Sequence, residues 1–211
     1  MIRCTSVLCE AERERIIEKS RFIACVRPVR DRAAAEAFFA ARRTLHRGAA
    51  HNVPVFVIGE KGALQWASDD GEPQGTSGAP ILRLLLAEGL TDVALLVTRY
   101  FGGVKLGTGG LARAYAGVAR LAVEAAGICD IDEQVLLTYR IDYSLLGRLQ
   151  NRARQDDLFR IKDTVFGEAV IVTLAGPVEH ADALAALVAD MSAGAGELLT
   201  RETEFVRIAR R

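Results

Sequence analysis

VTRYFGGVKLGTGGLARAY, residues 97–115, is the stretch that decides the fold of the first half of the chain, because it joins an apolar strand to a helix. Glycine adopts backbone conformations that a Cβ forbids, so a glycine-rich joint can turn several N–H groups toward one point. The positive end of the helix dipole adds to the potential there. Aromatic side chains beside basic ones can also stack on bases. The stretch therefore predicts a site for nucleic-acid phosphate or another anion, formed by Arg99, Tyr100, Phe101, Gly102, Gly103, Lys105, Gly107, Thr108, Gly109, Gly110 and Arg113.

The spacing of these glycines differs from the known nucleotide loops. A Walker A loop has Lys and then Ser or Thr directly after its last glycine, whereas Gly107 is followed by Thr108 and Gly109. The dinucleotide fingerprint G-x-G-x-x-G does not occur in this register. A ligand-free corner is the alternative, but a corner alone requires neither Arg99 nor Lys105.

A second loop upstream, DDGEPQGTSGAP at 69–80, supplies a candidate acidic and polar site. Its members, together with a histidine that precedes the strand at 53–60, are His51, Asp69, Asp70, Glu72 and Thr76. Clustered carboxylates suit a divalent cation, but their spacing fits no calcium loop, so no metal is predicted. Two alternatives stay open, a solvated acidic turn and pairing of these acids with Arg99 or Lys105. No catalytic residue or cofactor is predicted, because no serine elbow, zinc-protease or Cys–His signature is present.

The periodicity predicts an α+β fold with two domains, 1–133 and 134–211. In the first, strands are expected at 21–29, 53–60, 63–68, 92–98 and 128–132, and helices at 30–46, 81–88 and 108–126. In the second, strands are expected at 135–143, 159–167, 169–176 and 196–210, and helices at 144–157 (Ser144 as N-cap) and 179–194. This β-α-β-β-α-β order is that of a ferredoxin-like sandwich.

The charge balance of the chain limits the kinds of binding partner that can be expected. Lys plus Arg equals Asp plus Glu at 27 each, and this balance argues against an extended nucleic-acid coat or an anionic-membrane protein. A local basic patch is still compatible with it. No window approaches a membrane-spanning apolar run and the N-terminus does not resemble a secretory signal, so a cytoplasmic protein without a membrane partner is expected.

Three segments together carry a family resemblance. They are LLVTRYFGGVKLGTGGLARAY, the upstream SDDGEPQGTSGAPIL and, before it, AAHNVPVFVIGE. The chain resembles the IMPACT (YigZ-like) family over roughly 15–128. This resemblance implies a first domain similar in fold to domain IV of elongation factor G, to a ribosomal-protein domain and to the GHMP kinases. It implies a second domain similar to domain V of elongation factor G.

Eukaryotic members of that family regulate translation, so the resemblance implies an RNA- or ribosome-binding module linked to translation and without catalysis. Two other functions stay open. One is an enzyme acting on a phosphorylated or anionic small molecule in the cleft between the two loops, with Asp69 or Asp70 on a metal and Lys105 on phosphate. The other is a protein-interaction scaffold.

Overall fold

The computed structural model of the protein describes residues 2–155 and 158–210. The chain has mixed helices and strands and divides into two compact units, which confirms the predicted α+β class with two parts. The N-terminal unit consists mainly of Cys4–Ile131, and the C-terminal unit mainly of Asp132–Val206. No helix of the described residues is long and apolar enough to cross a membrane.

The N-terminal unit is built on an antiparallel sheet with the strand order β2-β3-β6-β4-β5. These strands are β2 (Ala11–Ile17), β3 (Ser20–Pro28), β4 (His51–Ile58), β5 (Leu64–Ala67) and β6 (Val93–Tyr100). The central strands β3, β4 and β6 are buried along nearly their whole length, because helices cover both faces of the sheet.

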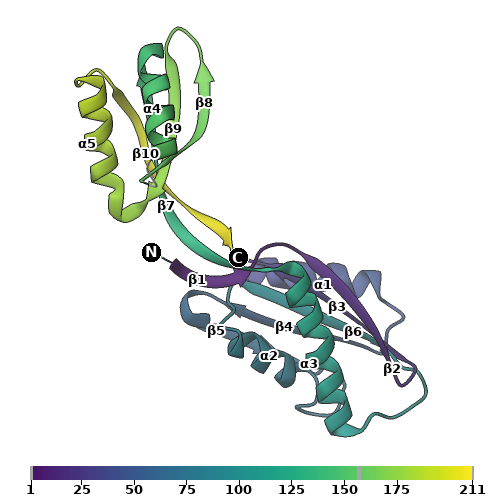
Figure 1. The fold of residues 1–211 in the computed structure, drawn as a ribbon. Coiled ribbons are helices and arrows are strands. Elements are labelled where there is room, and N and C mark those ends of the chain that lie inside the picture. Colours follow the sequence, from purple (N-terminus) through teal and green to yellow (C-terminus); the bar gives the residue numbers. More distant parts are fainter. Residues whose placement is uncertain (1, 156–157, 211) are drawn as a thin grey trace. The chain divides into compact units, whose positions relative to one another are not determined.

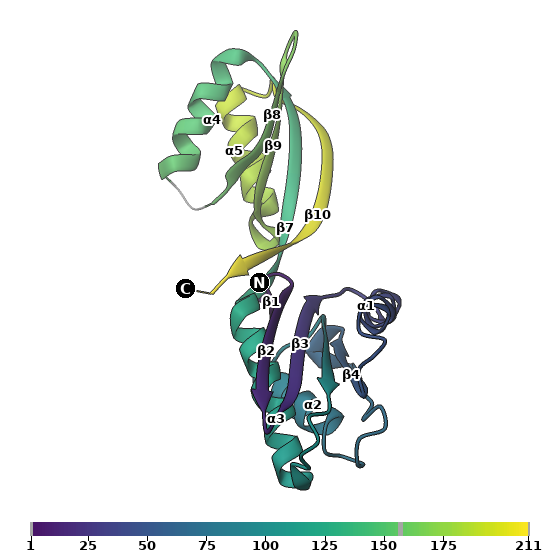
Figure 2. The ribbon, with the colours of Figure 1, turned by 90° about the vertical axis from the view of Figure 1, so that its right-hand side faces the viewer.

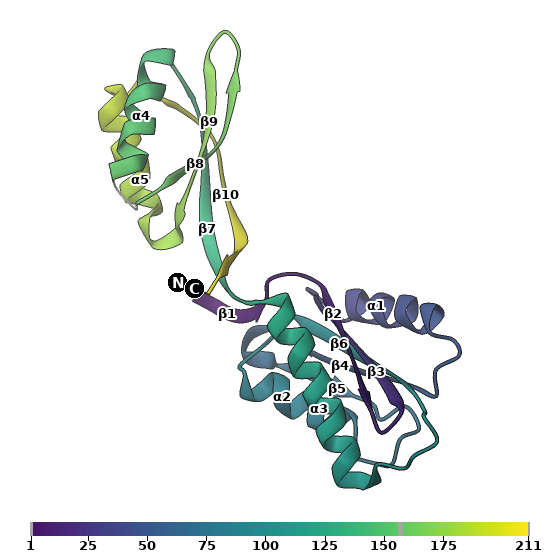
Figure 3. The ribbon, with the colours of Figure 1, turned by 45° about the vertical axis from the view of Figure 1, so that its right-hand side comes forward.

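Figures 1 and 3 show α2 (Gly78–Ala87) and α3 (Gly107–Ala126) on one face of this sheet and α1 (Arg32–Leu45) on the other. A short helix, Glu60–Gly62, joins β4 to β5, which pair as the predicted hairpin. Side chains alternate between the faces of a strand. Accordingly Val55 and Val97 pack in the core under α2 and α3, whereas Phe56 and Leu96 pack in the core under α1.

The secondary structure differs from the expectations at several positions. Separate strands are expected at 128–132 and 135–143, but β7 (Ile128–Ile141) is one strand, and its buried positions keep the same phase on both sides of three half-buried residues, 132–134. β1 (Ile2–Val7), which pairs with β7, and β2 lie where no strand was predicted. Most of β2, AERERII, is exposed at a sheet edge, where charges replace the apolar alternation that marks a strand.

The C-terminal unit follows the predicted β-α-β-β-α-β order. Its elements are β7, α4 (Tyr143–Gln155), β8 (Arg160–Phe166), β9 (Val170–Pro177), a short helix Val178–His180, α5 (Ala181–Ser192) and β10 (Glu197–Ala209). The strand order is β10-β7-β9-β8, and Figure 2 shows α4 and α5 on the same side of that sheet. Ser144 lies inside α4 rather than at its N-cap, since the helix begins at Tyr143. The predicted end of this helix, 156–157, lies outside the described residues.

Candidate functional site

Strand register brings the first site residues together. His51 on β4 pairs with Arg99 on β6, and Phe22 on β3 pairs with the same arginine from the other side. Arg99 is two residues beyond Val97, so it shares the face that α2 and α3 cover. The next residue, Tyr100, belongs to the opposite face, and its hydroxyl lies 3.0 Å from Nδ1 of His46. Tyr100 is therefore separated by the sheet from Arg99, with which the sequence had grouped it.

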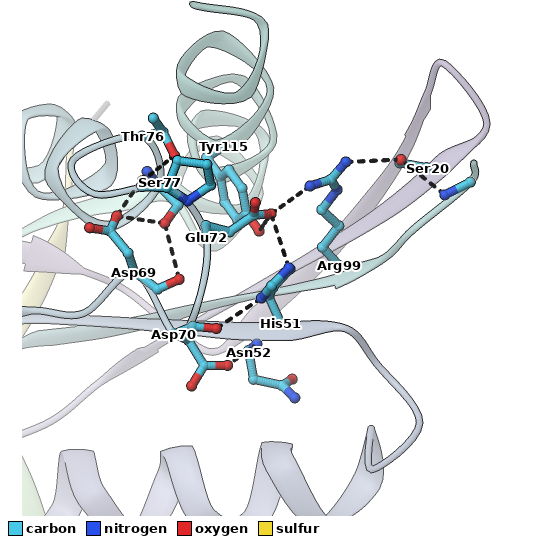
Figure 4. Close-up of polar contacts among 12 residues, drawn as sticks. Ser20, His51, Asn52, Asp69, Asp70, Glu72, Thr76, Ser77, Arg99 and Tyr115 are labelled. Atoms are coloured by element: carbon cyan, nitrogen blue, oxygen red, sulfur yellow. Dashed lines mark hydrogen bonds and ion pairs between the residues drawn. The ribbon is translucent and has the colours of Figure 1, made fainter. Parts of the chain in front are cut away.

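Glu72 is the centre of the site (Figure 4). Its Oε1 accepts hydrogen bonds from Nη1 of Arg99 at 2.6 Å and from the Tyr115 hydroxyl at 2.8 Å. Nε2 of His51 lies 3.8 Å from the same oxygen. The side chains of Arg99 and Glu72 are only 6% and 4% exposed, and charges so deeply buried persist only when they are paired. The alternative in which a loop acid pairs with Arg99 is confirmed for Glu72.

Tyr115 reaches this carboxylate from α3, where it lies on the buried face of the helix. Burial and the nearby Glu72 carboxylate raise the pKa of Tyr115, so its hydroxyl stays protonated and donates. Its ring also packs edge-on against Phe22, with the ring centroids 5.2 Å apart. Tyr115 thus links the helix, the sheet and the acidic loop.

The rest of the Arg99 guanidinium is held by the sheet. Nη2 donates to Oγ of Ser20 at 3.3 Å, and the same Oγ accepts the Gly102 N–H at 3.2 Å. The guanidinium carbon lies 5.3 Å from the ring centroid of Phe22 and 5.4 Å from that of Phe101. Because Glu72 compensates its charge, Arg99 acts as a fixed planar wall of the site rather than as a free cation.

Asp69 organises the loop that carries Glu72. Its carboxylate accepts hydrogen bonds from the backbone N–H groups of Gly75, Ser77 and Gly78 at 2.7–3.0 Å, and from the Ser77 hydroxyl at 2.7 Å. Burial opposes ionisation, but these donors outweigh it and hold the pKa of Asp69 below its ordinary value. Since Gly78 begins α2, the carboxylate also closes the N-terminus of that helix.

Asp70 and Thr76 complete the loop, and Asp70 also contacts His51 at the start of β4. Oδ2 of Asp70 accepts the Asn52 N–H at 2.6 Å, and its carbonyl lies 2.8 Å from Nδ1 of His51. The Thr76 hydroxyl donates to the Pro73 carbonyl at 2.6 Å. Within the ranges that the structure describes, no group of three or more His, Cys, Asp or Glu side chains is arranged to hold a metal ion.

Replacing Asp69 with asparagine is expected to lower the free energy of unfolding at neutral pH by about 1–3 kcal/mol, because one oxygen acceptor becomes a donor facing N–H groups. Since the folded pKa is lowered, the stabilisation is present above the ordinary carboxyl value of 3.8 and is lost as pH falls through the folded value. The asparagine variant should therefore lose less stability in that acid range. Denaturant titrations at neutral and acid pH measure both effects, with the exposed Glu60→Gln as the control.

The acidic loop and the glycine-rich joint enclose a cavity of about 390 Å³, called here the Glu72 pocket, and its walls are provided mainly by His51, Glu72, Arg99, Phe101, Lys105 and Thr108. A neighbouring cavity of about 480 Å³, called here the basic hollow, is lined by Arg15, Glu18, Lys105, Leu106, Gly110 and Arg113 among others. Lys105 lines both cavities.

The basic hollow borders the first turn of α3. Leu106, at the N-cap, makes no capping hydrogen bond with its side chain, so the first N–H groups of this helix are not capped by a side chain there. Among the described residues, neither Lys105 nor Arg113 has an ion-pair partner, and both are exposed. The hollow therefore offers net positive charge beside a helix N-terminus, with three basic side chains against the single carboxylate of Glu18.

The predicted residues thus form two adjoining cavities rather than one site. His51, Glu72, Arg99, Phe101, Gly107 and Thr108 line one, Gly110 and Arg113 line the other, and Lys105 lines both. Tyr100, Asp69, Asp70 and Thr76 line neither and act through the contacts described above, and three of the predicted glycines, Gly102, Gly103 and Gly109, also line neither. Ser20, Arg15 and the role of Tyr115 are site features that the sequence did not indicate. Only Tyr115 had a local signal, its place on the apolar face of the helix.

Models of two known protein families match the chain, one in each unit. The model of the Impact N-terminal domain matches residues 18–123, and a domain of unknown function (DUF1949) matches residues 140–195. The chain is similar to the IMPACT family member YvyE of Bacillus subtilis, with 39% identity over 75% of this chain and 73% of that protein. It is also similar to the IMPACT family member YigZ of Escherichia coli, with 33% identity over 88% of this chain and 92% of that protein.

One solved structure agrees with this over nearly its whole length. A crystal structure of a hypothetical protein matches with a TM-score of 0.63 and 30% identity, over 96% of this chain and 98% of that one. A structure of the two-domain translational regulator Yih1 also matches, at 22% identity over 60% of this chain and 48% of that one, with a TM-score of 0.35.

Proposed function

The chain belongs to the IMPACT family, and on this premise we propose that its N-terminal unit binds RNA phosphate, on the ribosome or on an RNA that takes part in translation, without catalysis. The family's link to translation regulation motivates the choice of RNA. Because ribosomes and their RNAs are cytoplasmic partners, the proposal places the protein in the cytoplasm.

The basic hollow is the observation that carries the proposal. Arg15, Lys105 and Arg113 surround it and Glu18 is its single acidic side chain, so the local charge is positive although the whole chain is neutral. Phosphate binding follows the local potential rather than the net charge. The glycines of the joint allow a backbone to approach the first turn of α3 closely.

Arg99 does not belong among the phosphate contacts that this proposal uses. Its guanidinium is paired with Glu72 and buried, so a variant at this position would test folding more than binding. Lys105 and Arg113 are the informative pair, because both are exposed and neither supports the core.

The double variant Lys105→Ala/Arg113→Ala is expected to bind ribosomes about 10- to 100-fold more weakly at low salt. Each phosphate contact releases counterions, so the slope of log affinity against log salt should also become shallower by roughly 1–2. Co-sedimentation of the full chain with ribosomes across a salt series measures both quantities.

The control for that experiment is Arg32→Ala/Arg120→Ala, which removes the same charge from exposed ion pairs elsewhere on the N-terminal unit. If the control and the test variant lose affinity equally, the binding is nonspecific and the basic hollow is not its site. If neither loses affinity, the contact with RNA lies on another surface and the proposal is wrong.

A further inference from the structure

We infer that the Glu72 pocket receives the base of a guanine nucleotide while Lys105 at its rim contacts the phosphate, an inference that rests on the proposed RNA-binding function. The ligand is a guanosine phosphate, either free or as one unpaired nucleotide of an RNA. The pocket is adjacent to the basic hollow, and a volume of about 390 Å³ lies within the range of small-ligand sites.

His51 presents an acceptor to the pocket. Its Nδ1 lies 2.8 Å from the Asp70 carbonyl, which can only accept, so Nδ1 carries the proton. In the neutral imidazole the other nitrogen, Nε2, then has a free lone pair. His51 lines the pocket and its Nε2 lies 3.8 Å from Oε1 of Glu72, so a ligand donor that enters between the two residues meets both acceptors.

Glu72 presents a second acceptor beside the first. Arg99 and Tyr115 both donate to Oε1, and no described residue donates to Oε2. A carboxylate has about four lone-pair sites, so Oε2 retains its capacity to accept. Oε2 is also absent from the buried polar atoms that lack a partner, which is consistent with an atom open to the pocket.

Two neighbouring acceptors select a ligand with two neighbouring donors. On its Watson–Crick edge guanine carries the N1–H and the exocyclic N2 amino group side by side. Adenine and cytosine carry one donor beside an acceptor there, and uracil carries one donor between two acceptors. A site that hydrogen-bonds a group rejects analogues lacking it, because its own buried polar atoms are then left unpaired.

Stacking supplies the second half of the recognition. The exposed ring of Phe101 and the buried guanidinium of Arg99 both line the pocket, with Phe22 behind the guanidinium. Phe101 is 53% exposed, so one face of its ring can be reached by a ligand. Aromatic faces bind unstacked bases, so the exposed ring of Phe101, backed by the guanidinium, suits a base that has left a helix or was never in one.

The decisive experiment compares GMP with IMP, which differs from it only by the missing 2-amino group, and with AMP and UMP. Isothermal titration of the full chain is expected to show GMP binding about tenfold or more tightly than IMP, since one hydrogen bond to a charged acceptor is lost. A second arm uses short single-stranded RNAs with one guanosine or one inosine. Preference for guanosine only in the RNA identifies an unpaired nucleotide as the source, and preference only in the monophosphate identifies a free nucleotide.

Two variants test the assigned contacts. Glu72→Gln keeps the side-chain shape and should remove the preference for GMP over IMP. Because Glu72 is buried and this variant could unfold, Phe101→Ala serves as a second test and should weaken GMP and IMP binding about equally, with the exposed Phe166→Ala in the C-terminal unit as its control.

Equal affinity for all four monophosphates and for both RNAs would overturn the inference. Ribosome binding that remained salt-sensitive in the same preparations would then leave the proposed function standing. If the protein does not bind ribosomes but still prefers guanine, the proposed function is wrong and the inference about the Glu72 pocket stands.

Discussion

Alanine in place of Glu72 is expected to lower the free energy of unfolding of the N-terminal unit by about 3–5 kcal/mol. The substitution leaves the Arg99 guanidinium buried without its counter-charge and the Tyr115 hydroxyl without its acceptor. A buried charge that loses its partner costs far more than the pair contributes, because its desolvation is no longer offset. Removal of this carboxylate disturbs strand, loop and helix together.

Trp66 provides the measurement. It is the single tryptophan of the chain, lies on β5 and stacks on Phe56 with centroids 5.7 Å apart, so its fluorescence reports on the N-terminal unit. Denaturant titrations should show the loss for Glu72→Ala and partial recovery when Arg99→Met is added, since the double variant leaves no unpaired charge. Glu14→Ala, which breaks a half-exposed pair with Arg21, is the control and should change little. If Glu72→Ala and Glu14→Ala lower the free energy of unfolding by the same amount, the buried-pair account is wrong.

Alanine in place of Gly102 is expected to destabilise the same unit by about 3 kcal/mol or more. An added Cβ would lie 2.0 Å from the carbonyl carbon of Lys19 and 2.4 Å from the backbone nitrogen of Ser20. These are backbone atoms, so the end of β6 and the β2–β3 turn would have to separate. That movement also displaces the Ser20 hydroxyl, which holds both the Gly102 N–H and Arg99.

Gly117→Ala is the matched control, because nothing lies within 4 Å of the added methyl inside α3. It should stabilise the unit by up to about 1 kcal/mol through helix propensity. Hydrogen exchange adds a spatial test, since Gly102→Ala should increase exchange first in the β2–β3 hairpin. If both glycine variants are equally stable, the close approach at Gly102 is not a constraint on the fold.

Most elements of this fold were predictable because their signals are local. The strand before the glycine-rich joint, the helix after it and the β-α-β-β-α-β order of the second half follow from periodicity and from turn residues. β2 was missed because its pairing with β3 is a tertiary contact, and its sequence at an exposed edge carries charge instead of apolar alternation. The single strand β7 was missed because charged residues at 132–133 resemble a break when only local polarity is considered.

The composition of the site was partly predictable, but its geometry was not. A glycine-rich joint beside basic residues indicates where an anion can bind, and this depends on neighbouring residues alone. Whether Arg99 is free or neutralised depends on Glu72, which is 27 residues away in sequence, and on Tyr115, which is 43 residues from Glu72. Tyr100 shows the limit most clearly, because adjacency in a strand places it and Arg99 on opposite faces.

The pairing of His51 with Arg99 across β4 and β6 has a consequence for the quality of folding. A register shift of one residue between these strands would move every side chain of one strand to the opposite face of the sheet. A chain misfolded in this way would retain its secondary structure and much of its apolar burial, but it would separate the histidine from the arginine and its carboxylate. Binding of the proposed ligand would therefore distinguish correctly registered molecules from compact ones with shifted strands.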